Sequence, residues 1–168
     1  LTSLGYQTEV LLRSFEGEVI EHPDYLVLRT PRNPGYRWGN FLIFQHPPKQ
    51  GDLEKWKDIF AKEVGTPPQY QHFLFGWDGS NAGLGAKEEF LAAGFELYND
   101  VVLTAQSVTP PPKFNRDCTI RTFKSEDWHD WIGLKRDANL AEREEERESD
   151  DEHFRHYLEN KASESQRM

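Results

Sequence analysis

This chain of 168 residues contains very little cysteine and no long apolar run. Its single cysteine, Cys118, has no second thiol for an internal disulfide and no companions for a cysteine-based zinc site, which favours a reducing compartment and a cytoplasmic protein. No stretch approaches the roughly eighteen apolar residues that span a bilayer, and no basic and then apolar N-terminus resembles a signal peptide. We therefore predict no membrane segment.

Positive charge is also scarce. The 20 Lys+Arg residues stand against 29 Asp+Glu residues, so the net charge is -9. A nucleic-acid-binding protein neutralises phosphates with basic side chains and releases their counterions, and a chain this acidic would be repelled instead. The composition therefore argues against a nucleic-acid partner.

Aromatic residues, by contrast, are plentiful and unevenly spread. Of the 22 aromatic side chains, 16 lie before residue 113 and six after it. Thr109 and the three prolines that follow it form a stiff, extended linker signal at this change of composition. A chain of this length can hold one complete domain and part of a second. We predict a first domain at 1–108, a linker at 109–117 and an incomplete unit at 118–168.

The hydrophobic pattern of the first domain alternates between strand and helix periods, which predicts a mixed α/β unit. The glycines and prolines between the periodic segments mark the turns. The expected elements are a hairpin of strands 18–21 and 25–30, a strand at 38–44 covered on both faces, a helix capped by Asp52 and running to Val64, a strand at 70–77, a short helix at 86–93, and a closing hairpin of strands 95–98 and 101–105.

The second unit is predicted to run β-α-α. Residues 118–123 alternate like a strand, Ser125 or Asp127 opens a helix, and Ser149 begins a last amphipathic helix that includes Leu158. One strand and two helices bury too little apolar area to close a core. The chain also begins with Leu1 and ends at Met168 inside a helical pattern, so we expect a fragment of a longer protein.

The order of these elements resembles the later part of the GNAT superfamily of acetyltransferases, whose domain runs β-α-α-β-β-β-α-β-α-β-β. The segment 89–96, EFLAAGFE, followed by 101–104, resembles the family's closing helix, its GFE turn and its last two strands. The segment 119–127, TIRTFKSED, is similar to the family's IRPFTPED opening. The resemblance implies a tandem protein: a mainly antiparallel GNAT-like sheet flanked by helices, then the β-α-α start of a second copy.

The resemblance also implies acetyl-CoA as co-substrate. The family binds its pyrophosphate through a Gln/Arg-x-x-Gly-x-Gly/Ala loop at a helix N-terminus, where free N–H groups attract an anion. Here the equivalent loop is residues 45–51, QHPPKQG, in which Pro47 and Pro48 remove two donors and one glycine remains. We therefore interpret the first copy as degenerate, with the working cofactor site expected beyond this chain. The candidate cofactor-binding residues are Gln45, Lys49, Gln50 and Gly51.

Two other motifs can be interpreted either as functional sites or as ordinary structural features. Ser80, Gly83 and Gly85 resemble a pyrophosphate loop, but a glycine-rich turn is the better interpretation. His153 and His156 share a helix face and leave a metal's coordination unfilled, so we predict no metal site.

Three further features have plain interpretations as well. Cys118 is more simply a packing residue than a nucleophile. The acidic run 142–152 is a solvated segment or an attractor of a cationic amine. The aromatic cluster of residues 36–77 is predicted to be core.

Two functions follow as expectations. In the first, the chain is part of an acetyl-CoA-dependent N-acetyltransferase, in which a general base takes the proton of an amine and a strand amide polarises the thioester carbonyl. Its partners would be a small-molecule or peptide amine acceptor, and a homo-oligomer or a second GNAT copy. In the second, the chain is a non-catalytic GNAT-like binding or scaffold module. The residues by themselves identify neither the catalytic groups nor the acceptor.

Overall fold

The computed structural model describes residues 1–79, 83–113, 115–143 and 158–160, and of residues 139–143 it describes the backbone alone. The chain forms two compact units, one made of Leu1–Tyr98 with Glu148–Met168 and the other of Asn99–Arg147. The predicted domain limits at residues 108 and 117 differ from this division and stay a prediction.

A four-stranded mixed sheet lies at the centre of the first unit. Its strands are β1 (Glu18–Glu21), β2 (Tyr25–Arg29), β3 (Phe41–Phe44) and β4 (Phe75–Trp77), and they lie side by side in that order. The pairs β1–β2 and β2–β3 are antiparallel, whereas β3–β4 is parallel. The parallel pair requires a crossover, which helix α2 (Asp52–Glu63) supplies. The predicted mixed α/β class and the first hairpin are thus confirmed.

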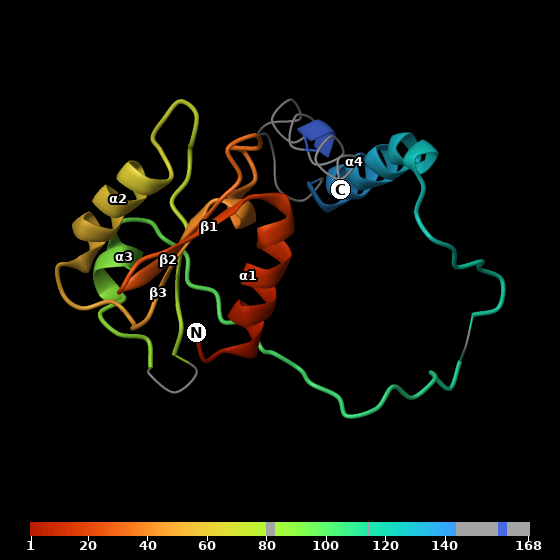
Figure 1. Cartoon of the computed structure of the whole chain (residues 1–168), viewed down its shortest axis with the longest axis horizontal. Helices are drawn as coiled ribbons and strands as arrows, with labels where there is room; N and C mark the ends of the chain where they lie inside the picture. Colours follow the sequence, from red (N-terminus) through yellow and green to blue (C-terminus); the bar gives the residue numbers. More distant parts are fainter. Residues whose placement is uncertain (80–82, 114, 144–157, 161–168) are drawn as a thin grey trace. The chain divides into compact units, whose positions relative to one another are not determined.

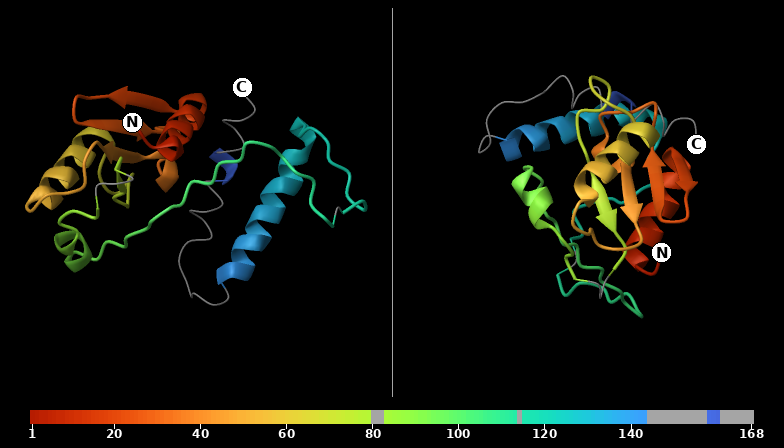
Figure 2. Two further views of the ribbon diagram at one scale, coloured as in Figure 1. Left: turned by 90° about the horizontal axis from the view of Figure 1, so that it is seen from below. Right: turned by 90° about the vertical axis from the view of Figure 1, so that its left-hand side faces the viewer.

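Helices cover both faces of the sheet. Helix α1 (Leu4–Glu16) lies against one face, and α2 and α3 (Glu88–Ala92) lie on the other (Figure 1; Figure 2). Because successive strand residues point to opposite faces, the four residues of β3 divide between two cores. Leu42 and Phe44 join the core under α2, while Phe41 and Ile43 join the core under α1.

Helix α1 is an element that the sequence analysis did not assign. Its N-cap is Ser3, whose side-chain oxygen accepts a hydrogen bond from the Tyr6 backbone N–H at 3.4 Å. Tyr6 and Val10 contact the core formed by Leu28, Phe41 and Ile43. No residue of the helix is itself buried, so α1 presents a large surface to solvent.

Two predicted strands of the first domain are shorter than expected. Only Phe41–Phe44 of the segment 38–44 is a strand, because Arg37–Gly39 turns as a 3-10 helix, and only Phe75–Trp77 of 70–77 pairs with a neighbour. The cap of α2 is Gly51 in the left-handed region (φ 84°), not Asp52, which is the first helical residue. Both corrections concern boundaries, which depend on pairing and on loop geometry.

The predicted closing hairpin is wrong. Residues 95–98 and 101–105 form no strand, although their sequence favours one. Phe95 still packs against the main core, whereas Val101 is 77% and Leu103 is 88% exposed. A two-stranded ribbon is marginal without a sheet or helix beside it, and among the described residues nothing pairs with these segments.

The second unit contains one long helix, α4 (Trp128–Arg143), entered through a 3-10 turn at Ser125–Asp127. The helix confirms the prediction for this segment. The predicted strand at 118–123 is wrong: the segment pairs with no strand in the part of the chain that is described, and Ile120 is 90% exposed. The last predicted helix, from Ser149, lies outside the described residues except for 158–160, which are helical.

Candidate functional site

The candidate cofactor loop lies between β3 and α2, at the carboxyl end of a parallel strand pair, which is where open α/β sheets commonly bind ligands. Its first residue, Gln45, is tied to the turn of the β1–β2 hairpin. The side-chain Nε2 of Gln45 donates to the Pro23 carbonyl at 2.6 Å, and its backbone N–H donates to the Asp24 carbonyl at 3.2 Å. Gln45 therefore serves as an anchor of the loop.

Two N–H groups of the loop just before α2 are bonded to carboxylates of the chain itself. Asp52 accepts from the Lys49 backbone N–H at 2.8 Å. Glu89, which belongs to α3, accepts from the Gly51 backbone N–H with both oxygens, at 2.9 and 3.0 Å. A carboxylate at a helix N-terminus is stabilised by the same free donors and dipole that attract a phosphate. The Glu89 carboxylate thus lies at the entry of α2.

The segment that carries Glu89 is held against the loop by its backbone. The Ala86 N–H donates to the Pro48 carbonyl at 2.7 Å, and Pro48 is buried. A side chain at Gly85 would collide with that carbonyl, and its φ of 62° also favours glycine. Gly85 therefore permits a close approach of two loops, which agrees with the plain interpretation of the glycine motif. Ser80 lies outside the described residues.

The structure brings Lys49, Gln50 and Gly51 together at the entry of α2, with their side chains or backbone exposed. Lys49 is the one Lys or Arg residue within residues 45–51. Two of the loop residues are prolines without an N–H group, and Lys49 and Gly51 have their N–H groups bonded internally. The loop thus retains few donors for an added anion.

A second carboxylate accepts hydrogen bonds from backbone N–H groups just before α1. Asp78, the residue after β4, accepts hydrogen bonds from the backbone N–H and hydroxyl of Thr2 and, at 3.0 Å, from the Ser3 N–H. The Asp78 side chain is 5% exposed, and its own backbone N–H donates to the Phe44 carbonyl at 2.8 Å. The sequence analysis did not identify Asp78 as a site residue. Its partner lies 75 residues away, so local sequence gives no signal for it.

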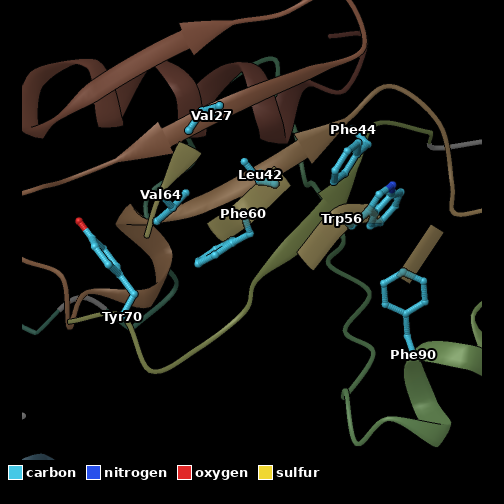
Figure 3. Close-up of a cluster of buried hydrophobic side chains, with 8 residues drawn as sticks. All are labelled: Val27, Leu42, Phe44, Trp56, Phe60, Val64, Tyr70 and Phe90. Atoms are coloured by element: carbon cyan, nitrogen blue, oxygen red, sulfur yellow. The ribbon is translucent and has the colours of Figure 1, made fainter. Parts of the chain in front are cut away.

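Most of the predicted aromatic cluster is core, as expected. Phe44 stacks on Trp56 with ring centroids 3.8 Å apart, and Phe60 is 0% exposed (Figure 3). The rings of Phe75 and Phe90 complete this packing. Two members are exceptions: Phe73 is 39% exposed, and Trp38 is 49% exposed because the chain turns before β3 begins. The buried rings form a packed interior.

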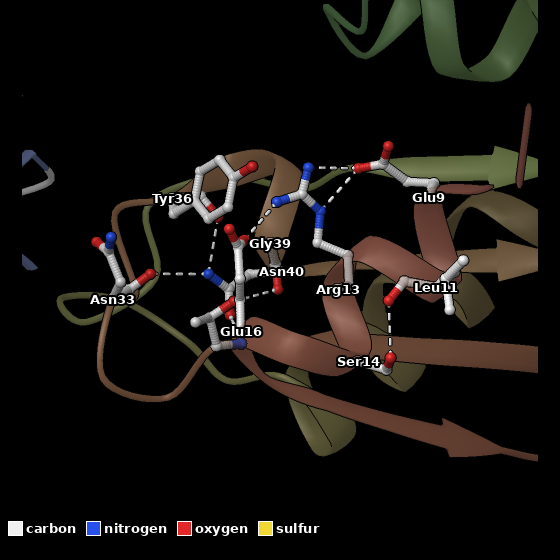
Figure 4. A network of polar contacts seen from close by, with 10 residues as sticks. Glu9, Leu11, Arg13, Ser14, Glu16, Asn33, Tyr36, Gly39 and Asn40 are labelled. Carbon is white, nitrogen blue, oxygen red and sulfur yellow. Dashed lines mark hydrogen bonds and ion pairs between the residues drawn. The ribbon is translucent and has the colours of Figure 1, made fainter. Parts of the chain in front are cut away.

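The loop before β3 is held by a buried amide. Asn40 Oδ1 accepts from the Thr30 N–H at 2.8 Å, and its Nδ2 donates to the carbonyls of Asn33 at 2.9 Å and Tyr36 at 2.8 Å (Figure 4). The His72 ring contacts the Asn40 carbonyl at 3.0 Å. A fully bonded buried amide fixes one loop conformation. The sequence analysis missed this residue, and its only signal was a polar residue inside the apolar run 38–44.

One cluster of titratable side chains connects the β1–β2 turn to the end of α2. His22 Nε2 lies 3.6 Å from Glu63 Oε2, and the Tyr25 hydroxyl donates to Glu63 Oε1 at 3.3 Å. Burial acts to raise the pKa of Glu63, but Lys62, His22 and Tyr25 outweigh it and hold that pKa below its ordinary value. Burial and the Glu63 carboxylate raise the pKa of Tyr25. These contacts fasten the hairpin to α2.

The remaining candidate groups do not assemble into a site. Cys118 is exposed, and its sulfur contacts only the Asn115 amide, at 3.3 Å, within the described residues. No cluster of three or more His, Cys, Asp or Glu side chains that could hold a metal is present in the part of the chain that is described. His153 and His156 and most of the acidic run 142–152 lie outside that part.

Comparisons of the chain with protein families, with characterised proteins and with solved structures find no match. Among the helices that the structure describes, none has both the length and the apolarity to cross a membrane.

Proposed function

We propose that this chain is the supporting GNAT-like module of a cytoplasmic, acetyl-CoA-dependent N-acetyltransferase that acts on an amine, with the cofactor site beyond this chain. Two features support the proposal. The motif segment 89–96 resembles the family's closing segment. The order of three antiparallel strands, a crossover helix, a parallel strand and a further helix also matches the family's order from its second strand onward.

The observation that carries the supporting role is the contact of Glu89 with Gly51. A cofactor pyrophosphate would have to displace a carboxylate that is tethered to the same domain and bonded at 2.9 and 3.0 Å. It would also approach Asp52, which bonds the next donor, Lys49 N–H. Two negative groups next to the entry of α2 disfavour a third by charge repulsion. The module therefore does not bind acetyl-CoA at this loop.

A titration of the 168-residue chain with acetyl-CoA tests this proposal. We expect no change in melting temperature and no heat of binding up to millimolar cofactor, because a ligand stabilises a protein only by binding its folded state. The variant Glu89→Ala frees the Gly51 N–H but leaves Pro47 and Pro48 without donors, so it should not bind either. Glu88→Ala, on the exposed neighbouring position, is the matched control.

The outcomes separate the candidates. Saturable binding by the unchanged chain would overturn the supporting role and restore a working cofactor site. Binding by Glu89→Ala alone would identify Glu89, not the prolines, as the block. Absence of acetyl transfer to a panel of amines by the complete protein would contradict the acetyltransferase and leave the second candidate, a non-catalytic scaffold module, which the internally bonded loop also favours.

A further inference from the structure

The outer face of α1 is an exposed apolar surface in the first unit. Four large apolar side chains of the helix occupy it: Leu4 is 57%, Leu11 59%, Leu12 52% and Phe15 64% exposed. A helix turns about 100° per residue, so Leu4, Leu11 and Phe15 lie on the side opposite Tyr6 and Val10, which contact the sheet. Contiguous apolar surface of this kind marks an interaction site more often than scattered single residues do.

The spacing of these residues is that of a helix-pairing seam. Within the helix, positions 4, 8, 11 and 15 follow the alternating four- and three-residue steps of a heptad repeat, with Leu, Thr, Leu and Phe in turn. The partner that such a seam fits is another helix, whose side chains enter the spaces between these residues.

The charges beside the seam indicate which kind of helix would pair with it. The positions beside the seam, 5, 7, 12 and 14, are Gly, Gln, Leu and Ser, so no charge there selects an oppositely charged partner. The three charged residues of α1 bond one another instead: Arg13 contacts Glu9 at 2.6 Å and Glu16 at 2.7 Å. An anionic lipid surface is disfavoured, because membrane-binding helices carry Lys and Arg along their polar face.

We propose that the outer face of α1 pairs with the same face of a second copy of this chain. Two chains of net charge -9 repel each other over most of their surfaces, and this neutral face is one at which they meet without opposing like charges. A two-fold contact places one surface against itself, so an uncharged seam is self-complementary.

The area sets the strength of the dimer. A helix of 13 residues is about 20 Å long and offers far less than the roughly 800 Å² per partner of a standard stable interface. The dimer is therefore weak and reversible.

Light scattering and sedimentation equilibrium of the 168-residue chain between 10 μM and 1 mM test the pairing. The mass should rise from 19.6 kDa towards twice that value with concentration. Leu11→Glu and Leu11→Lys should each raise the dissociation constant at least about tenfold, because they place like charges in a neutral seam. Their mixture should restore association. Leu91→Glu, at an exposed leucine of α3, is the matched control and should leave the dimer unchanged.

Circular dichroism keeps folding and association apart, since a 59% exposed Leu11 should tolerate substitution without loss of the fold. A chain that stays monomeric at 1 mM overturns the proposal. So does equal weakening by Leu91→Glu, or a mixture of the Glu and Lys variants that fails to associate. A monomer that Leu11→Glu destabilises would show that the chain covers this face with its own residues, which also overturns it. None of these results depends on acetyl-CoA.

Discussion

In Leu1–Tyr98 the apolar side chains of the sheet are withdrawn from water, whereas in Asn99–Arg147 similar side chains face it. Leu42 and Phe60 are both 0% exposed, while Val108 is 96% and Ile120 is 90% exposed. The difference is not one of hydrophobicity, because both regions contain strand-favouring aliphatic residues. It depends on whether elements distant in the chain come together to cover them.

The contacts of the two regions differ in range. In the first, Asp78 bonds Ser3 across 75 positions and Gly51 bonds Glu89 across 38. In the second, the hydrogen bonds and ring contacts of the described residues are local: Arg121 pairs with Asp127, and the ring centroids of Trp128 and Trp131 are 5.3 Å apart. Local contacts order a segment, but they do not build an interior. The comparison predicts that the stability of the chain resides in the first region.

The largest expected effect is that of Phe60→Ala in the main core. Phe60 is fully buried and meets the rings of Phe73 and Phe75, so the substitution removes apolar burial and leaves a cavity. We expect the free energy of unfolding in urea to fall by about 3 to 5 kcal/mol. Ile120→Ala in the second region should change it by less than about 0.5 kcal/mol. Equal losses from both variants would break the comparison.

Next in size is Asn40→Ala, which removes the hub of the loop network. The Thr30 N–H and the carbonyls of Asn33 and Tyr36 lose a buried partner, and we expect a loss of about 3 kcal/mol. Asn115→Ala is the control from the second region, since its side chain bonds only neighbours within three positions. Chemical denaturation measures both. A loss below about 1 kcal/mol for Asn40→Ala would indicate that water replaces the amide.

A smaller effect is expected for Glu89→Ala. It removes the carboxylate that bonds the Gly51 N–H at the start of α2, and loss of such a cap costs about 1 kcal/mol. Thermal unfolding of this variant beside Glu88→Ala measures the difference. Identical melting temperatures would show that the long-range cap adds nothing to the first region.

The smallest effect concerns the pH dependence of the second region. The Arg121 guanidinium, together with the Lys124 N–H, lowers the pKa of Asp127 from 3.8 to about 2. A lowered pKa means that the pair stabilises this turn above pH 4 and loses that contribution as the pH falls from about 4 towards 2. Carboxyl NMR titration should give a midpoint near 2, rising in Arg121→Ala. A midpoint of 3.8 in the unchanged chain would contradict the pair.

Elements whose signal is local could be predicted. The hairpin of β1 and β2 and the helix α2 follow from periods of two and 3.6 residues within short windows. Core positions such as Phe44 and Trp56 follow from their place on these elements. By contrast, α1 was not assigned, because apolar residues occur on both its sheet-facing and its outer side and blur the helical period. Residues 95–105 and 118–123 have strand propensity, but no described strand pairs with them.

The candidate site could be located only in part. The sequence identified residues 45–51 as the loop at the start of a helix and showed that Pro47 and Pro48 remove donors. It gave no indication that Glu89 bonds Gly51, since the two residues are brought together by the packing of α3 and by the close contact of Gly85 with Pro48.

Composition and periodicity by themselves determined the mixed α/β class, most of the aromatic core and the two missing N–H donors of the loop 45–51, because each depends on residue type within a short stretch. Tertiary structure alone decided which strand-like segments become strands, which carboxylate fills the start of α2, and which face of α1 remains open. Each of these outcomes depends on contacts with residues from elsewhere in the chain. The local sequence of a strand-like segment or of an N–H donor does not indicate which distant residue will pair with it.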